Sequence, residues 1–178
     1  DVYLGARATE RHFLDSGFQE AAILVFATHA LDSLEAWYVR EPTLVLSPEF
    51  DLEKSAFEDG LLTETEIREF DLKADLVVLN ACRTVGLADF SGLSDAFFYA
   101  GAKSLFVTFW QVESNVAREV NLAFFDSLKS EPDISSGEAL RNAKLKFLER
   151  SEKSGFGNPY YWAPFAMVGS SSGQSLRM

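Results

Sequence analysis

The chain has 178 residues, 47% of them hydrophobic and 24% charged, a composition typical of one folded domain and unlike that of a disordered chain. Its formal net charge of −11 argues against direct binding to DNA or RNA, whose phosphates would be repelled. The apolar runs fall short of the roughly 18 residues of a membrane helix. The single cysteine, Cys82, excludes an internal disulfide and, with no signal-peptide pattern, favours a cytoplasmic protein.

In chain order, short apolar segments alternate with helical patterns. In the first part we expect a short helix after Thr9, a strand over 21–28, and an irregular stretch over 31–60 that contains a short strand at 43–46 and an exposed loop at 50–59. A helix from Thr63 to about Phe70, a strand over 75–81, a helix over 92–100 and a strand over 103–110 follow. The last expected elements are helices from Ser114 and over 138–152 and a strand over 162–168. Apolar runs without alternation predict strands buried on both faces, as in parallel sheets. Pro164 places the last strand at an edge.

This order predicts an α/β fold with a mostly parallel sheet flanked by helices. We expect one domain over residues 1–169 and a polar tail over 170–178. Thr63 and Glu66 have the spacing of a capping box, Ser114 is the expected cap of the following long helix, and Gly101 is the expected helix stop.

Two residues that could carry chemistry follow predicted strands. His29 comes directly after the first strand and Cys82 directly after the second. If these strands are parallel neighbours, both side chains lie at the same sheet edge, where α/β proteins place their active groups. A thiolate is a nucleophile and imidazole can exchange its proton near neutral pH, so the pair is a minimum set for acyl transfer.

Each residue alone has a simpler interpretation. A lone cysteine at a strand end is more often inert packing, and a lone histidine is more often structural. The order along the chain is informative, because His29 precedes Cys82 by 53 residues. Caspases have this order and a similar spacing, whereas papain-like enzymes place the cysteine first. The sequence contains no nucleotide-binding motif and too few histidines and cysteines for a structural zinc site, so we expect no cofactor and no metal.

Six motifs in order along most of the chain resemble those of CHAT domains, the caspase-like domains often joined to tetratricopeptide repeats. They are 26–29 (FATH), 60–67 (GLLTETEI), 79–84 (LNACRT), 100–102 with 110–112 (AGA, WQV), 139–141 (ALR) and 159–165 (PYYWAPF). The resemblance implies a three-layer caspase-like fold. The chain begins at Asp1 without Met, and its opening 4–9 (LGARAT) resembles a segment part-way into the family's domain, so we expect the first strand or two to be missing.

The resemblance further implies a clan CD cysteine endopeptidase. Cys82 would be the nucleophile and His29 the acid and base. Backbone N–H groups of Cys82 and Ala30 would hold the oxyanion. Trp110, Glu113 and Asn80 would line the substrate pocket, although Trp110 could equally be core and Glu113 a solvated residue before a helix.

The expected substrate is a specific protein partner, cleaved after a basic residue, in regulated prokaryotic signalling or defence. The expected partners are an adjoining repeat region or a regulatory protein, with no membrane. Two departures from the family pattern point to an alternative, a catalytically silent interaction module: Ala30 stands where glycine is usual, and Ser114 replaces a second acidic residue. A small-molecule acyl-transfer enzyme with the same Cys–His pair is a third interpretation.

Overall fold

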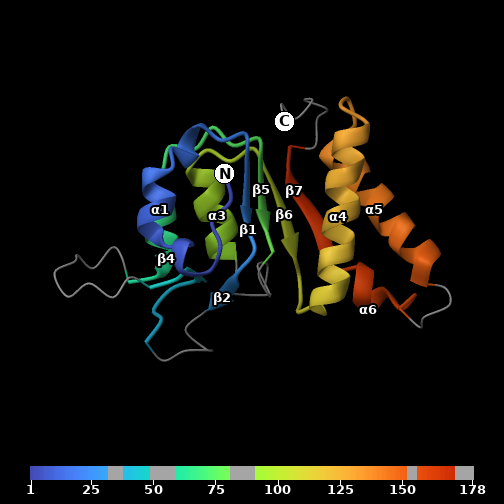
Figure 1. Cartoon of the computed structure of the whole chain (residues 1–178), viewed down its shortest axis with the longest axis horizontal. Coiled ribbons are helices and arrows are strands. Elements are labelled where there is room, and N and C mark those ends of the chain that lie inside the picture. The colour runs from blue at the N-terminus through green and yellow to red at the C-terminus, as the bar shows by residue number, and fades with distance from the viewer. Residues whose placement is uncertain (32–37, 49–58, 81–90, 152–155, 171–178) are drawn as a thin grey trace.

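A four-stranded sheet forms the middle layer of the fold (Figure 1). The computed structural model describes residues 1–31, 38–48, 59–80, 91–151 and 156–170. The strands, in spatial order, are β1 (Ile23–Phe26), β5 (Leu76–Leu79), β6 (Ser104–Thr108) and β7 (Phe165–Gly169). β1, β5 and β6 run parallel and β7 runs antiparallel to β6, so the sheet is mixed but mostly parallel, as the apolar runs predict.

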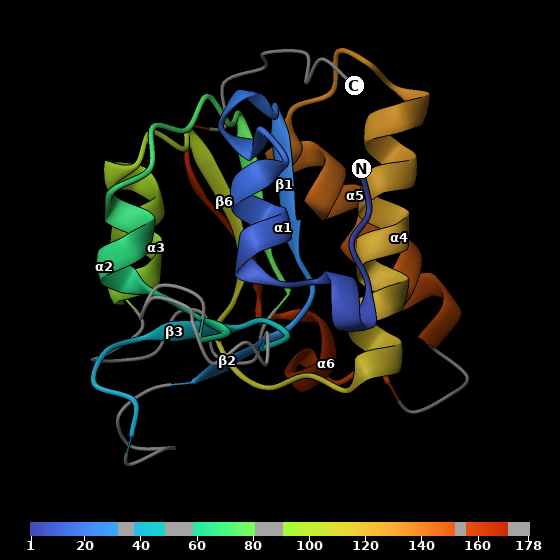
Figure 2. The ribbon, with the colours of Figure 1, turned by 60° about the vertical axis from the view of Figure 1, so that its left-hand side comes forward.

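Helices cover both faces of this sheet (Figure 2). On one face lie α1 (Glu10–Asp15), α2 (Glu64–Arg68) and α3 (Ser91–Tyr99), with two short 3-10 helices, η1 (Gly5–Arg7) and η2 (Phe18–Glu20), nearby; on the other lie α4 (Ser114–Ser130), α5 (Ser136–Ser151) and the short α6 (Pro159–Trp162). Side chains alternate along β5 between the two cores: Val77 belongs to the same core as Phe97 of α3, whereas Val78 belongs to the same core as Phe124 of α4. All four β5 residues are therefore buried, as expected for a central strand.

A second, antiparallel sheet was not predicted. Its strands are β2 (His29–Leu31), β3 (Thr43–Val45) and β4 (Leu61–Thr63), in that order. The prediction of a short strand at 43–46 is confirmed, but the stretch around it is more regular than expected. The carboxylate of Glu10, buried in α1, accepts the N–H of Gly60 at 2.8 Å and ties this sheet to the first helix. The predicted loop at 50–59 lies outside the described residues except for Asp59.

Most predicted helix ends are confirmed. The Thr9 hydroxyl accepts the N–H of His12 at 3.2 Å, and Thr63 and Glu66 form the full capping box. Gly101 follows α3 with φ +112, a conformation that favours glycine. The cap predicted at Ser114 is wrong, because Ser114 is the first helical residue and Glu113 is the N-cap, without a side-chain capping hydrogen bond.

The last predicted strand starts later than expected. Trp162 belongs to α6, a four-residue helix that the apolar run concealed, and β7 begins at Phe165. β7 is an edge strand, as Pro164 predicts, and the carbonyl of Pro164 accepts the N–H of Phe109 at 3.0 Å. Within the described ranges, no helix combines the length and the apolar content needed to cross a membrane.

Candidate active site

Three predicted site residues follow neighbouring parallel strands at the same distance. One row of the sheet joins β1, β5 and β6 through Val25, Val78 and Phe106. His29, Cys82 and Trp110 each come four residues after this row along their own segment of the chain. Parallel strands end at one edge of a sheet, so the three segments leave the sheet on the same side. Cys82 itself lies outside the described residues, and its distance from His29 stays a prediction.

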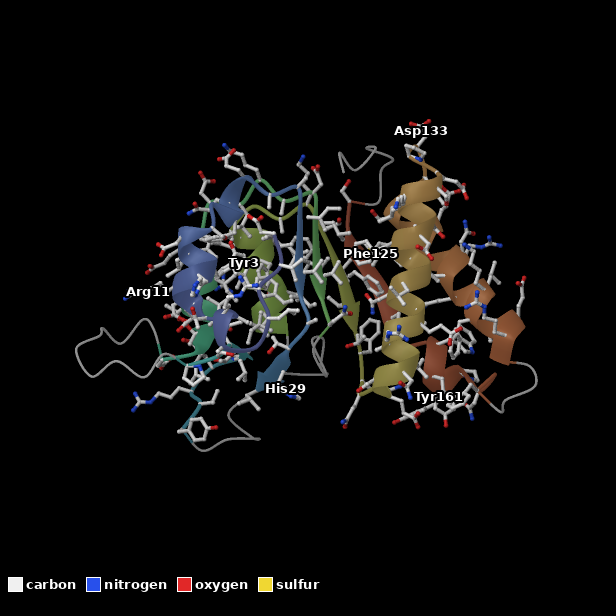
Figure 3. All side chains as sticks on the ribbon, in the orientation of Figure 1. Tyr3, Arg11, His29, Phe125, Asp133 and Tyr161 are labelled. Atoms are coloured by element: carbon white, nitrogen blue, oxygen red, sulfur yellow. The ribbon has the colours of Figure 1, made fainter. Side chains whose placement is uncertain are left out.

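His29 does not follow β1 directly. β1 ends at Phe26, and the chain then turns through Ala27 and Thr28 into β2, whose first residue is His29. The hydroxyl of Thr28 donates a hydrogen bond to the carbonyl of Val45, which draws the segment away from the large sheet. The imidazole is exposed, near the bottom of the view in Figure 3. The ring is therefore accessible to a substrate or partner from solvent.

Ala30 has a buried side chain. The residue is 5% exposed and belongs to the same apolar core as Leu44 and Leu62 of the small sheet. Ala30 lies in the middle of β2, an extended conformation that alanine adopts without strain. The alanine at this position thus has a packing role that a glycine would not fill.

The backbone N–H of Ala30 is directed away from β3. The N–H of Leu46, at the end of β3, donates to the carbonyl of Gly60 beside β4 at 2.8 Å. Hydrogen-bonding groups alternate in direction along an antiparallel strand, so the groups of Val45 point toward β2, where His29 lies opposite. The N–H of the next residue, Ala30, therefore points to the edge of β2 that has no strand neighbour in the described sheet. Strand pairing among the described residues does not use this N–H.

Trp110 forms a pair with Tyr160 of α6. The indole Nε1–H of Trp110 donates to the carbonyl of Tyr160 at 2.9 Å, and the two rings are stacked with centroids 6.3 Å apart and an interplanar angle of 30°. The hydroxyl of Tyr160 reaches the carbonyl of Gln111 at 3.5 Å. Trp110 is half-buried and Tyr160 is 54% exposed, so the pair is an aromatic surface rather than part of either core. Sequence reasoning missed Tyr160, although it lies in the PYYWAPF motif.

The other two predicted pocket residues lie on neighbouring elements. Glu113 is exposed at the N-cap of α4, where the helix dipole favours a carboxylate. Asn80 is half-buried directly after β5, and its N–H donates to the carbonyl of Phe26 at 2.8 Å. Among the described residues, no hydrogen bond joins either side chain to Trp110. The structure thus pairs Trp110 with Tyr160 and leaves the roles of Glu113 and Asn80 as predictions.

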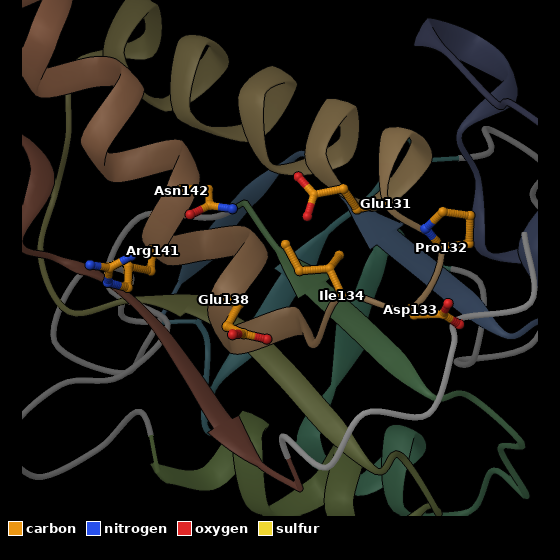
Figure 4. A pocket seen from close by; sticks show the side chains of 7 residues that line it. All are labelled: Glu131, Pro132, Asp133, Ile134, Glu138, Arg141 and Asn142. Carbon is orange, nitrogen blue, oxygen red and sulfur yellow. The ribbon is translucent and has the colours of Figure 1, made fainter.

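The hollow at the turn between α4 and α5 holds none of the predicted site residues (Figure 4). It has a volume of about 530 Å³ and is lined by three carboxylates, those of Glu131, Asp133 and Glu138, together with Arg141. Asp133 lies near the top of the view and His29 near the bottom (Figure 3). In the described part of the chain, no group of three or more His, Cys, Asp or Glu side chains could hold a metal ion.

Comparisons with known proteins agree with the sequence resemblance. The family model of the CHAT domain matches residues 1–170. No curated protein matches the chain.

Proposed function

Since the chain belongs to the CHAT domain family, a caspase-like module related to clan CD cysteine peptidases, we propose that it is a cysteine endopeptidase. The observation that carries the proposal is the shared spacing of His29, Cys82 and Trp110 beyond one row of three parallel strands. This spacing supports a base on one side of the nucleophile and an aromatic wall on the other.

The proposed reaction is acyl transfer through the thiol of Cys82. His29 takes the thiol proton, and the sulfur attacks the carbonyl carbon of the scissile peptide bond. The resulting oxyanion accepts hydrogen bonds from the backbone N–H groups of Cys82 and Ala30. Collapse of this intermediate breaks the C–N bond, and the leaving amine takes the proton from His29. Water then attacks the thioester, again through His29, and releases the acid and the free thiol.

The proposed substrate is a specific protein with a basic residue at the cleaved bond. The Trp110–Tyr160 pair offers aromatic faces to an adjacent side chain of the substrate, and such faces attract cations. The exposed carboxylate of Glu113 and the net charge of −11 favour the same choice. We place this activity in the cytoplasm, where the thiol stays reduced, under the control of an adjoining repeat region or a regulatory protein.

Peptide cleavage and covalent trapping test this proposal together. Fluorogenic peptides ending in Arg, Lys or Asp are incubated with the protein and with Cys82→Ala, which should show no cleavage. A peptide ketone ending in Arg should add one inhibitor mass to the wild type and none to Cys82→Ala. Cleavage that persists in Cys82→Ala would contradict the proposal.

The second candidate function is a catalytically silent interaction module. Its support is the exposed start of α4, where Ser114 replaces the second acidic residue of the family pattern and leaves Glu113 alone. A wild-type protein that folds yet neither cleaves the peptides nor reacts with the peptide ketone would favour this candidate.

A further inference from the structure

The outer face of α4 carries opposite charges at equal distances on either side of the middle of the helix. α4 runs from Ser114 to Ser130, so Leu122 is its central residue. Arg118 stands four residues before Leu122 and Asp126 four residues after it, and all three side chains are exposed. Residues four apart lie on one face of a helix, so these three form a single row.

Neither charge in this row is neutralised within the described chain. Arg118 and Asp126 are separated by about 12 Å along the helix axis, which is too far for a salt bridge. Neither forms an ion pair with any residue in the described ranges. In contrast, Glu119 on the same helix is paired with Arg150 of α5, with 3.3 Å between nitrogen and oxygen. The charges of Arg118 and Asp126 are thus available to a partner.

The centre of the row is apolar and has open space beside it. Leu122 is 52% exposed, and a hollow of about 530 Å³ next to it is lined by Leu122 and Ala123 together with charged side chains of both helices, among them Arg118 and Asp126 of the row and Lys146 and Arg150 of α5. α4 and α5 form the outer layer on this side of the sheet (Figures 1 and 2). A single exposed leucine is common on a protein surface. Here it lies midway between two unpaired opposite charges, with room for another side chain.

We propose that this face binds the same face of a second copy of the chain, with the two α4 helices antiparallel about a two-fold axis at Leu122. A two-fold axis places each residue before Leu122 opposite the residue equally far after it in the other copy. Arg118 of each copy then meets Asp126 of the other, so two ion pairs flank a contact between the two Leu122 side chains. Rows of residues four apart are also the rows that interdigitate in the commonest class of helix packing.

This dimer is expected to be weak and concentration-dependent. A contact between two helices about 25 Å long is smaller than the roughly 1,200 Å² at which standard interfaces begin. Each copy also carries a net charge of −11, which opposes association. The dimer does not depend on peptidase activity, so an experiment that contradicts one of the two proposals leaves the other unaffected.

Charge reversal tests the interface, because the antiparallel arrangement predicts that either variant alone loses the dimer and that a mixture of the two regains it. Arg118→Asp has carboxylates at both ends of the row, and Asp126→Arg has cations at both ends. In a dimer of either variant, like charges would face each other across the interface, so each variant alone should lose the dimer. Mixed in equal amounts, the two variants attract at both ends and should form a heterodimer. Arg141→Asp makes the same charge change at an exposed site on α5 outside the row and should leave the dimer intact.

The measurement is sedimentation equilibrium over a concentration series of the whole chain, under reducing conditions so that Cys82 cannot cross-link copies. Circular dichroism confirms that the variants are folded. A wild type that stays monomeric up to its solubility limit would overturn the proposal. So would a dimer that survives in Arg118→Asp or Asp126→Arg, or a mixture of these two variants that does not associate.

Discussion

Replacement of Ala30 by glycine separates the packing role of this residue from its proposed catalytic role. Glycine is the usual family residue at this position, and the substitution keeps the backbone N–H. It removes the methyl group of a residue that is 5% exposed and belongs to one apolar core with Leu44. A buried methylene contributes about 0.8 kcal/mol, and glycine within a strand costs about 0.5–1 kcal/mol relative to alanine. The expected loss is therefore about 1.5 kcal/mol of unfolding free energy.

The assay combines urea unfolding with peptide cleavage by the same preparation. With a slope of about 2 kcal/mol/M, the urea midpoint of Ala30→Gly should fall by on the order of 0.5–1 M. Turnover should change little, because losing an oxyanion donor costs about 10²–10³ in rate and this variant keeps the donor. Ala27→Gly is the control for the buried methyl, since Ala27 is exposed in the turn between β1 and β2. An unchanged midpoint would refute the packing argument. A gain in turnover of about a hundredfold would mean that alanine distorts the oxyanion site, and would favour the silent module.

The remaining predictions concern a turn, the aromatic pair and one half-buried lysine. Gly101→Ala brings a Cβ into a clash with the carbonyl oxygen of Leu72 at a φ of +112, so thermal denaturation should show a destabilisation of about 2–5 kcal/mol. Tyr160→Ala should lower kcat/KM for the preferred peptide about 2–12-fold by removing the aromatic partner of Trp110, whereas Tyr160→Phe should retain most activity. Burial lowers the pKa of Lys144 below its usual 10.5. At a pH between the lowered pKa and 10.5 the unfolded state binds more protons than the folded state, so the stability of the wild type relative to Lys144→Met should rise with pH. Urea unfolding over a series of alkaline pH values measures this, and an equal pH dependence of the two proteins would contradict it.

The central sheet was predictable because its strands are apolar along their whole length. Leu76–Leu79 and Ser104–Thr108 are buried at every position, which produces the uninterrupted apolar runs of the sequence. The direction of β7 was not predictable, because an edge strand beside β6 can pair in either direction. The second sheet was missed because its strands have three residues each, too few to show a period.

The candidate site was predictable only where a residue's chemistry stands out along the chain. His29 is one of two histidines, so its position after a strand is informative. Tyr160 was missed because its backbone carbonyl and its ring contact Trp110, which is 50 residues away in the sequence. A contact between such distant segments leaves no pattern in the sequence. The buried methyl of Ala30 was missed for the same reason, because the small sheet that covers it forms between strands that are far apart in the sequence.

The most direct test of the proposed dyad is the rate of alkylation of Cys82 by iodoacetamide as a function of pH. Cys82 is the one cysteine of the chain, so the reaction reports on a single site. A thiol without a base reacts with a midpoint near its ordinary pKa of about 8.5. In the wild type, the midpoint of the alkylation rate should lie well below a pH of about 8.5. In His29→Ala, this midpoint should move up toward about 8.5. His12→Ala, which removes the other histidine, should leave the profile unchanged. A His29→Ala profile that superimposes on that of the wild type would contradict the assignment of His29 as the base for Cys82.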